Sequence, residues 1–485
     1  MSSGYALLRE LKPYSLAEIA QEIGCEEMLA SEVVSHLLSH GIVRYRTGTE
    51  NDETETADEV GATDAQCYRF RYVGIVVTCG VVIICYPKYF VTRKPHRYEL
   101  KQMIRVLRKL DGFGELSRPY YEGASTDRLA VIVRLLELYD EHGVYTNFEE
   151  TRVLNGDGVI DWGRTVDTIN PVLSDGQPVY LDFWTRKTRR DETDVITRLH
   201  RAILTECSRF LTSCGLAELL GTGEIELSSE TVKEFGDAEY LDVMLERERA
   251  LQFVTWKQEV IDLMRLYLGG NELASVSDEV LCMGTTAYYH AWELACKVAF
   301  GDLLDTRLAE LPIKPNDKWS GRSNKSLLQI IPCPAWSKPG GTSLGNVDTL
   351  IPDTVTFFEH EDGSRLFCIY DAKYYVPELG QRITSQPGVE SVTKQFLYQS
   401  AYKQFVVDHA FDKVVNAFLV PSENNQIELM ATVEFSSVMG SLVHEIPQFS
   451  DHIDMWALPA SQVFEHYLRS TRMDARTLFC ITADC

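Results

Sequence analysis

Two apolar runs in the C-terminal half of the chain each carry an aspartate near one end. The first run extends from Leu350 to Phe358 and the second from Arg365 to Tyr375, with a strong turn signal between them. We expect a β-hairpin, in which a three-residue loop with Gly363 in the left-handed conformation places Asp353 directly opposite Asp371. A two-residue turn would shift the register by one position and turn Asp353 to the other face of the sheet.

Lys373 lies two residues after Asp371, so the two side chains share one face of the second strand. Charged groups inside an apolar run are usually paired or bound to a metal. Mg²⁺ prefers carboxylate oxygens, with Mn²⁺ as a substitute, and a nearby lysine stabilises negative charge on a phosphate. Asp353, Asp371 and Lys373 therefore predict metal-dependent phosphodiester hydrolysis. The alternative is a solvated strand of alternating charges, which agrees less well with the apolar neighbours.

The composition is that of an ordinary globular protein with an acidic balance. A chain of 485 residues, 45% of them apolar, is long enough for roughly two to four domains. The net charge of −24 argues against a uniformly basic nucleic-acid binder, although a local basic groove on an acidic body stays compatible with DNA. Twelve cysteines without a C-x-x-C pair, and no signal peptide, predict a reduced cytoplasmic setting. The longest apolar stretch, Tyr72 to Tyr86, is too short to span a bilayer, so we expect no membrane partner.

The periodicity and the turn signals predict a multidomain protein of the α/β (α+β) class. We expect a winged-helix-like module at residues 1–115, with an acidic, polar insertion at 47–65. Residues 116–270 read as a mixed, largely helical region for contact with DNA or a partner, and residues 271–485 as a nuclease-like core.

The N-terminal module is expected to begin with two helices. Ser15 has capping-box spacing to an acidic residue, and a second helix is expected from about Glu27 to His40. Strands follow, two of them turning near Cys79 and Gly80. A module of this shape binds DNA or another protein, and both interpretations stay open.

The eleven histidines form no credible metal cluster in the sequence. His36 and His40 are four residues apart on the expected second helix, but a third ligand is missing from the pattern. We therefore expect this pair simply to flank the end of a helix.

Aromatic and basic residues gather in the middle region. The functional interpretation is a contact with DNA or a partner protein, because interfaces are enriched in aromatic residues and arginine. The other interpretation is a turn, a strand near Val179 and a charged loop. The candidate contact residues are Trp162, Arg164, Arg186, Lys187, Arg189 and Arg190.

The last third of the chain has the order α–β–β–α–β–β, which fits an α/β nuclease core. Glu293, on a helix expected from about Ser277 to Phe300, is a candidate third carboxylate, or else a surface glutamate. Gln395 and Gln399 share one face of a strong helix expected at 389–411. One interpretation is that these two glutamines position water or the DNA backbone. The other interpretation is that they form a polar stripe at the edge of the core. Further strands are expected at 414–420 and 428–435.

These pieces resemble a known family. The run Ile351-Pro-Asp, followed by Ile369-Tyr-Asp-Ala-Lys-Tyr-Tyr, looks like the PD-(D/E)XK nuclease motif. Over roughly residues 150–440 the chain resembles the LlaJI-type restriction endonucleases, which are similar to the McrC subunit of McrBC systems. Three further segments carry this resemblance, namely Asp157-Gly-Val-Ile-Asp-Trp-Gly-Arg-Thr, Pro178-Val-Tyr-Leu-Asp and Thr197-Arg-Leu-His-Arg-Ala-Ile-Leu.

The resemblance implies a nuclease subunit that cuts double-stranded DNA in antiviral defence, together with an AAA+ GTPase. Asp353, Asp371 and Glu293 would then bind Mg²⁺, and Lys373 would be the catalytic lysine. Gln395 or Gln399 would match the helix glutamine of the family, although the family spacing of glutamine and tyrosine is not met here. The sequence contains no P-loop, which agrees with a separate partner for GTP.

Two other functions stay open on the sequence. The first is a non-catalytic adaptor, in which a nuclease-like fold binds and stimulates the GTPase. The second is a transposon or repair nuclease with the same core. The presence of Asp353, Asp371 and Lys373 together favours an enzyme over an adaptor, since a degenerate domain needs none of them.

Overall fold

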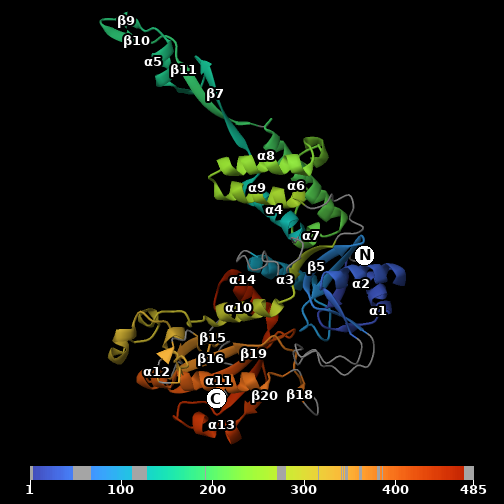
Figure 1. Cartoon of the computed structure of the whole chain (residues 1–485), viewed down its shortest axis with the longest axis vertical. Helices are drawn as coiled ribbons and strands as arrows, with labels where there is room; N and C mark the ends of the chain where they lie inside the picture. The colour runs from blue at the N-terminus through green and yellow to red at the C-terminus, as the bar shows by residue number, and fades with distance from the viewer. Residues whose placement is uncertain are drawn as a thin grey trace. The chain divides into compact units, whose positions relative to one another are not determined.

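Two compact units make up the computed structural model of the chain (Figure 1). One unit comprises residues 1–5 and 121–283, and the other comprises residues 6–120 and 284–485. The segments expected to form the N-terminal and C-terminal domains thus cluster in one unit, and the division into three domains stays a prediction. The structure describes residues 4–46, 67–111, 128–191, 193–269, 280–314, 316–339, 341, 343–344, 348–359, 363–379, 383–384 and 386–473.

The N-terminal part of the second unit contains the two predicted helices. The capping box at Ser15 is present, with reciprocal hydrogen bonds between Ser15 and Glu18, and the first helix ends at Gly24 with φ of 76°. The acidic insertion at 47–65 lies outside the described residues. The elements are β1 (Ala6–Arg9), β2 (Pro13–Tyr14), α1 (Leu16–Ile23), α2 (Glu27–Ser39), β3 (Val43–Arg46), β4 (Cys67–Phe70), β5 (Val73–Thr78), β6 (Val81–Tyr86) and α3 (Arg97–Asp111).

These strands form two small sheets. One has the order β2-β4-β3, and the other has the order β1-β6-β5-β12, where β12 spans Leu281–Thr285. The hairpin between β5 and β6 turns at Cys79 and Gly80, as the sequence predicts, and both residues have positive φ.

The first unit combines helices with an extended pair of strands. Its elements are α4 (Arg128–His142), β7 (Asn147–Leu154), β8 (Val159–Ile160), α5 (Trp162–Thr168), β9 (Val172–Ser174), β10 (Gln177–Val179), β11 (Trp184–Asp191), α6 (Val195–Ser213), α7 (Ala217–Leu220), the 3₁₀-helix η2 (Val232–Phe235), α8 (Ala238–Leu251) and α9 (Thr255–Gly269). Within this unit β7 and β11 pair antiparallel and lead away from the helices toward α5, β9 and β10 (Figure 1). We call residues 147–191 the arm.

The arm corrects one expectation. The basic cluster that begins at Arg186 was expected on a charged loop, but it lies on strand β11. The strand expected near Val179 is only the end of β10, and residues 180–183 are not in a strand. A ribbon of this kind leaves most of its side chains exposed on both faces, so the alternation of polar and apolar residues that marks a strand is absent.

The C-terminal part of the second unit contains a mixed five-stranded sheet in the order β15-β16-β19-β21-β20. β16, β19 and β21 are parallel, while β15 and β20 are antiparallel edge strands. The strands are β15 (Thr354–Glu359), β16 (Arg365–Ala372), β19 (Lys413–Ser422), β20 (Glu428–Glu434) and β21 (His452–Pro459). The helices are α10 (Tyr288–Phe300), α11 (Val389–Ala401), α12 (Lys403–Asp408), α13 (Ser436–Val443) and α14 (Ala460–Arg469). Short elements are η4 (Leu308–Glu310), η5 (Asp317–Arg322), η6 (Leu328–Ile330), β13 (Trp336–Ser337), β14 (Ser343–Leu344), β17 (Glu378–Leu379) and β18 (Ile383–Thr384).

Helices cover both faces of this sheet (Figure 1). On one face Tyr370 of β16 packs against Phe300 at the end of α10, with ring centroids 4.9 Å apart. On the other face Phe367 and Ile369 share a core cluster with Tyr398 of α11. Burial of both faces explains why β16 is a nearly continuous apolar run.

Three helix and strand boundaries differ from the expectation. The helix expected from Ser277 begins only at Tyr288, because β12 precedes it. The helix expected at 389–411 breaks at Tyr402, whose hydroxyl donates to the Leu327 carbonyl at 3.1 Å. β21 and α14 were not expected at all. Within the described part of the chain, no helix is long and apolar enough to cross a membrane.

Candidate active site

The predicted pairing of the two aspartates is confirmed. Strand β15 pairs with β16 in a register that joins Thr354 to Tyr370, and Asp353 directly precedes β15. Continued by one position, this register places Asp353 opposite Asp371, and the two carboxyl groups are in hydrogen-bond contact. Gly363 has φ of 85°, as the three-residue loop requires, while residues 360–362 lie outside the described part of the chain.

Backbone hydrogen bonds fix the positions of Asp353 and Lys373 at the end of β16. The Ala372 N–H donates to Asp353 Oδ2 at 2.9 Å, which fixes the Asp353 carboxylate against the end of β16. Lys373 follows directly after β16, and its N–H donates to the Leu419 carbonyl of β19 at 2.9 Å. The Lys373 Nζ lies 2.7 Å from Asp371 Oδ1, so the lysine and the acid form an ion pair at the strand end.

Asp371 is buried, with only 8% of its side chain exposed. Burial is the largest cause that raises its pKa, the neighbouring Asp353 raises it further, and the two together outweigh the opposing effect of Lys373 to give a pKa of about 8. Two carboxyl groups this close repel each other when both are ionised. A cation bound between them would remove that repulsion, and the oxygen donors are of the kind that Mg²⁺ prefers.

Glu293 supplies a third carboxylate from α10. Burial raises its pKa, and repulsion from Asp353 adds to that effect. Its Oε2 lies 3.4 Å from His290 Nδ1, one turn earlier on the same helix, and 33% of its side chain is exposed. The charge of Asp353 thus acts on both of the other predicted acidic ligands, Asp371 on β16 and Glu293 on α10.

Lys373 keeps its proton in this environment. Burial by itself would lower the pKa of Lys373, but the charge of Asp371 and the hydrogen bond to it raise the pKa above its ordinary value. A positively charged ammonium group thus lies beside two acidic side chains, and 22% of the Lys373 side chain is exposed.

The two helix glutamines have different surroundings, although both are fully buried. Gln395 Nε2 donates to the Ile369 carbonyl of β16 at 2.8 Å, and its Oε1 lacks a hydrogen-bond partner among the described residues. Gln399 accepts from Asn416 Nδ2 at 2.8 Å and from the Ser450 N–H at 3.2 Å, and it donates to the Ser450 carbonyl at 3.0 Å. These three bonds account for Gln399 as a link between α11 and the sheet.

Tyr398 is a residue near the site that sequence reasoning missed. Its hydroxyl donates to the Ile351 carbonyl at 2.9 Å, so α11 holds the segment that leads into Asp353. Burial raises the pKa of Tyr398, and Asp371 and Asp353 raise it further. The one feature of the sequence that could have pointed to Tyr398 is its spacing, since it lies three residues after Gln395 and therefore near the same face of the expected helix.

A second contact missed by the sequence joins the N-terminal part of the same unit to the residue after Lys373. The Tyr374 hydroxyl donates to Glu10 Oε2 at 2.6 Å, and Lys88 Nζ lies 4.8 Å from the centre of the Tyr374 ring. Glu10 and Tyr374 are both buried. They are 364 residues apart, so local sequence patterns contain no sign of this contact.

The predicted contact residues of the middle region lie on the arm, in the other unit. Trp162 is 53% exposed and packs edge-to-face on Phe183, with ring centroids 5.8 Å apart. The Arg164 guanidinium lies 4.4 Å from the Trp184 ring centre. Arg186 is exposed on β11, and Lys187 forms an ion pair with Asp157. The side chains of Arg189 and Arg190 lie outside the described part of the structure.

Comparison with known proteins gives a family match and one curated relative. The family model described as LlaJI restriction endonuclease matches residues 72–484. The component YdjA of the type II restriction enzyme BsuMI from Bacillus subtilis (strain 168) is 25% identical over 435 residues, which cover 84% of this chain and 83% of the relative.

Two solved structures of Thermococcus gammatolerans also match, both weakly. The first is a refined half-complex from the tetradecameric assembly of McrB AAA+ hexamers with bound McrC. It is 13% identical, covers 96% of this chain and 98% of the other, and gives a TM-score of 0.37. The second is the McrBC complex, which is 15% identical, covers 54% of this chain and 79% of the other, and gives a TM-score of 0.23.

Proposed function

The chain belongs to the LlaJI restriction endonuclease family, and on that premise we propose that it is the DNA-cleaving subunit of a cytoplasmic restriction system. It hydrolyses phosphodiester bonds at the site formed by Asp353, Asp371 and Lys373, with Mg²⁺ as the cofactor and Mn²⁺ as a substitute. The observation that carries this proposal is the pairing of Asp353 with Asp371 beside an ion-paired lysine, at the end of two adjacent strands.

The carboxylates supply the metal ligands. Asp353 is oriented by the Ala372 N–H, Asp371 by its ion pair with Lys373, and Glu293 approaches from α10. Burial and the charge of Asp353 raise the pKa of Asp371 in spite of Lys373, and this supports the proposal because a divalent cation would stabilise the ionised carboxylates. When bound, Mg²⁺ would lower the pKa of a coordinated water and offset the charge of the phosphate.

Lys373 acts on the negative charge that develops at the phosphate. Its ammonium is held in place by Asp371 and stays protonated, so it is ready before the substrate arrives. Preorganised positive groups of this kind stabilise transition states because they need no rearrangement during the reaction. The Gln395 amide group fixes α11 to β16 at Ile369, two residues before Asp371, and so supports the geometry of the strand end.

On the same grounds we assign the five-stranded sheet, with α10 and α11 on its two faces, to the PD-(D/E)XK nuclease class. The N-terminal helices α1 and α2, with the strands that follow, form a winged-helix-like module for contact with DNA or protein. These assignments rest on the order of elements and on the position of the acidic residues in the sheet.

We also propose that an AAA+ GTPase acts together with this chain on double-stranded DNA. The curated relative is named as one component of a restriction enzyme, which supports a multi-subunit system. This sequence contains no P-loop, which agrees with hydrolysis of GTP by a separate chain. The arm supports the same proposal, because it exposes apolar side chains such as Leu173 and Leu181, at 73% and 71%, beside the half-exposed Trp162.

The experiment that tests the site combines metal binding with DNA cleavage. Wild-type protein is expected to bind Mn²⁺ in a calorimetric titration and to cut DNA with Mg²⁺, and Asp371→Asn is expected to lose both. Asp451→Asn is the matched control, because Asp451 is 61% exposed and forms an ion pair with the neighbouring His452. Retention of metal binding and cutting by Asp371→Asn would overturn the proposed site.

A further inference from the structure

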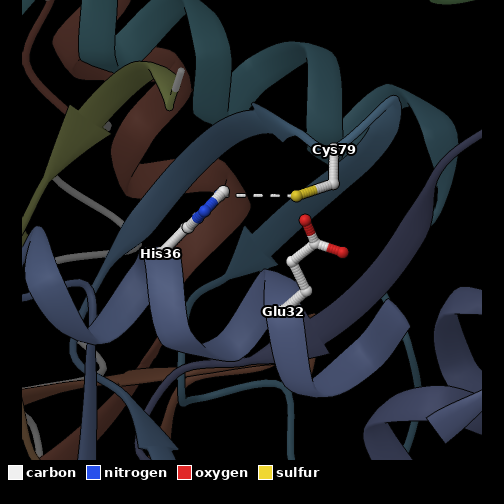
Figure 2. A group of neighbouring side chains, drawn as sticks. All are labelled: Glu32, His36 and Cys79. Atoms are coloured by element: carbon white, nitrogen blue, oxygen red, sulfur yellow. Dashed lines mark hydrogen bonds between the residues drawn. The ribbon is translucent and has the colours of Figure 1, made fainter. Parts of the chain in front are cut away.

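A second group of metal-binding side chains lies in the N-terminal part of the chain, formed by Glu32, His36 and Cys79 (Figure 2). Glu32 and His36 are one turn apart on α2, and both face the turn between β5 and β6, where Cys79 lies. One donor atom from each residue lies within 4.8 Å of the other two. We infer that these three side chains form a Zn²⁺ site.

The donor geometry fits zinc. The distance from His36 Nδ1 to Cys79 Sγ is 3.4 Å. A tetrahedral zinc ion with ordinary Zn–N and Zn–S bond lengths separates a nitrogen and a sulfur ligand by about 3.6 Å. A zinc ion therefore fits with a small adjustment of side chains, and water would complete the coordination at the exposed side near Glu32.

The backbone at Cys79 is a second, independent observation. Cys79 and Gly80 form the two-residue hairpin turn, with φ of 49° and 72°. Such a turn strongly favours asparagine, aspartate or glycine at the first position. A cysteine in the left-handed region is strained, and residues with this strain cluster at functional sites. The turn thus holds a residue that suits it poorly and that directs a thiol toward α2 (Figure 2).

The chemistry of the donors separates this site from the carboxylate site. Sulfur and imidazole nitrogen select zinc and similar transition metals, whereas Mg²⁺ prefers oxygen alone. His40, the other histidine of this helix end, directs its Nδ1 to the His36 carbonyl at 2.9 Å instead. On this inference the ligands that join His36 come from Glu32 and from a hairpin far away in the sequence, and His40 is not among them.

A zinc ion here would fasten α2 to the β5–β6 hairpin. Without metal, His36 Nδ1 is shared between Thr78 Oγ1, at 3.2 Å, and Cys79 Sγ. Coordination would replace these weak contacts by bonds to the metal and would fix the orientation of α2. Metal binding of this kind adds to the free energy of folding, because the site forms only in the folded chain.

The experiment titrates the metal-free full-length protein with Co²⁺, in the presence of excess Mg²⁺ to saturate the carboxylate site. Wild type is expected to bind one equivalent with an absorption band of thiolate coordination, which Zn²⁺ then displaces. Cys79→Asn is the main variant, because asparagine suits the turn better than cysteine. It is expected to lose the thiolate band, and His36→Ala is expected to weaken Co²⁺ binding by at least about tenfold.

Melting curves separate loss of metal from loss of fold. Cys79→Asn is expected to melt no lower than metal-free wild type, while Zn²⁺ raises the melting temperature of wild type only. Cys333→Ser and His40→Ala are matched controls that should keep the Co²⁺ spectrum of wild type, since Cys333 is exposed and His40 points to backbone. Absence of a thiolate band in wild type, or its persistence in Cys79→Asn, would overturn the inference.

Discussion

Asp353 raises the pKa of the buried Asp371. In the absence of a cation, this repulsion between the two carboxyl groups lowers the stability of the folded protein. Asparagine at position 353 keeps an oxygen that accepts from the Ala372 N–H but removes the charge that repels Asp371. Active sites that place like charges close together generally lower the stability of the fold, so a substitution that removes one charge stabilises the protein but reduces its activity.

We therefore expect Asp353→Asn to raise the melting temperature of the metal-free protein by about 2–4 °C and to lower DNA cleavage by at least about 100-fold. Thermal unfolding with and without Mg²⁺ checks the first part, since only wild type should gain stability from the ion. If metal-free Asp353→Asn melted at a lower temperature than metal-free wild type, repulsion between Asp353 and Asp371 would not be the dominant effect.

His200 of α6 is a residue whose protonation affects folding rather than catalysis. It is fully buried, its Nδ1 accepts from the Tyr145 N–H at 2.9 Å, and burial lowers its pKa to about 3. An exposed histidine in the unfolded chain has a pKa of about 6.5. Below that value the unfolded chain binds a proton that the folded chain does not, so stability falls as the pH falls from about 6.5 toward 3.

Between pH 7 and pH 5 this effect amounts to about 2 kcal/mol. His200→Asn keeps an acceptor for Tyr145 without a titrating group, so its α6 amides should lose less protection on acidification than those of wild type. Hydrogen exchange of α6 at the two pH values provides the measurement. An equal loss of protection in both proteins would remove His200 as the cause.

At the scale of elements, local signals identified the features that depend on neighbouring residues. The capping box at Ser15, the hairpin at Gly363 and the turn at Cys79 were predicted, because each follows from a few adjacent side chains. The start of α10 and the strand β12 were not predicted from the sequence, because a short buried strand and a helix segment have the same apolar pattern. The break at Tyr402 depends on a contact with Leu327, which lies 75 residues away.

In the arm, Gly158 lies where the backbone of β11 approaches most closely. A Cβ atom at Gly158 would lie 2.3 Å from the Arg186 carbonyl oxygen, so β8 pairs with β11 only when this position has no side chain. We expect Gly158→Ala to detach β8 from β11, at a cost of about 1–3 kcal/mol to the local structure.

Limited proteolysis of the arm checks this prediction, because detached strands are cut faster than paired ones. Gly163→Ala is the control, since the added atom would lie 3.7 Å from Asp161 Oδ1, an ordinary contact distance, and α5 tolerates alanine. Equal proteolysis of both variants and wild type would show that the close approach is relieved without loss of pairing.

At the scale of the whole chain, the sequence contained more information on the cluster of charged residues at the end of β16 than on the arrangement of domains. Asp353, Asp371 and Lys373 are within 21 positions of one another, and a hairpin register suffices to bring them together. The position of Glu293 near Asp353 depends on how α10 packs on the sheet. The contact of Glu10 with Tyr374 depends on the N-terminal and C-terminal segments forming one unit. Periodicity contains no information on such long-range contacts.

The net charge of −24 bears on how the chain reaches DNA. Non-specific DNA affinity comes mainly from contacts between cations and phosphates, so an acidic chain is expected to bind weakly alone and to depend on a partner. This dependence is part of the proposal that an AAA+ GTPase acts with the nuclease subunit, and it separates that proposal from a nuclease that works alone.

The most direct measurement is cleavage of plasmid DNA with Mg²⁺, with and without the AAA+ GTPase and GTP, by wild type, Lys373→Ala and Lys403→Ala. Lys403 pairs with Glu445 at the surface and serves as the matched control. The account predicts cutting that requires the partner, a loss of at least about 100-fold in Lys373→Ala and none in Lys403→Ala. Undiminished cutting by Lys373→Ala would contradict the proposed site, and stimulation of the GTPase without any cutting by wild type would contradict the nuclease function itself.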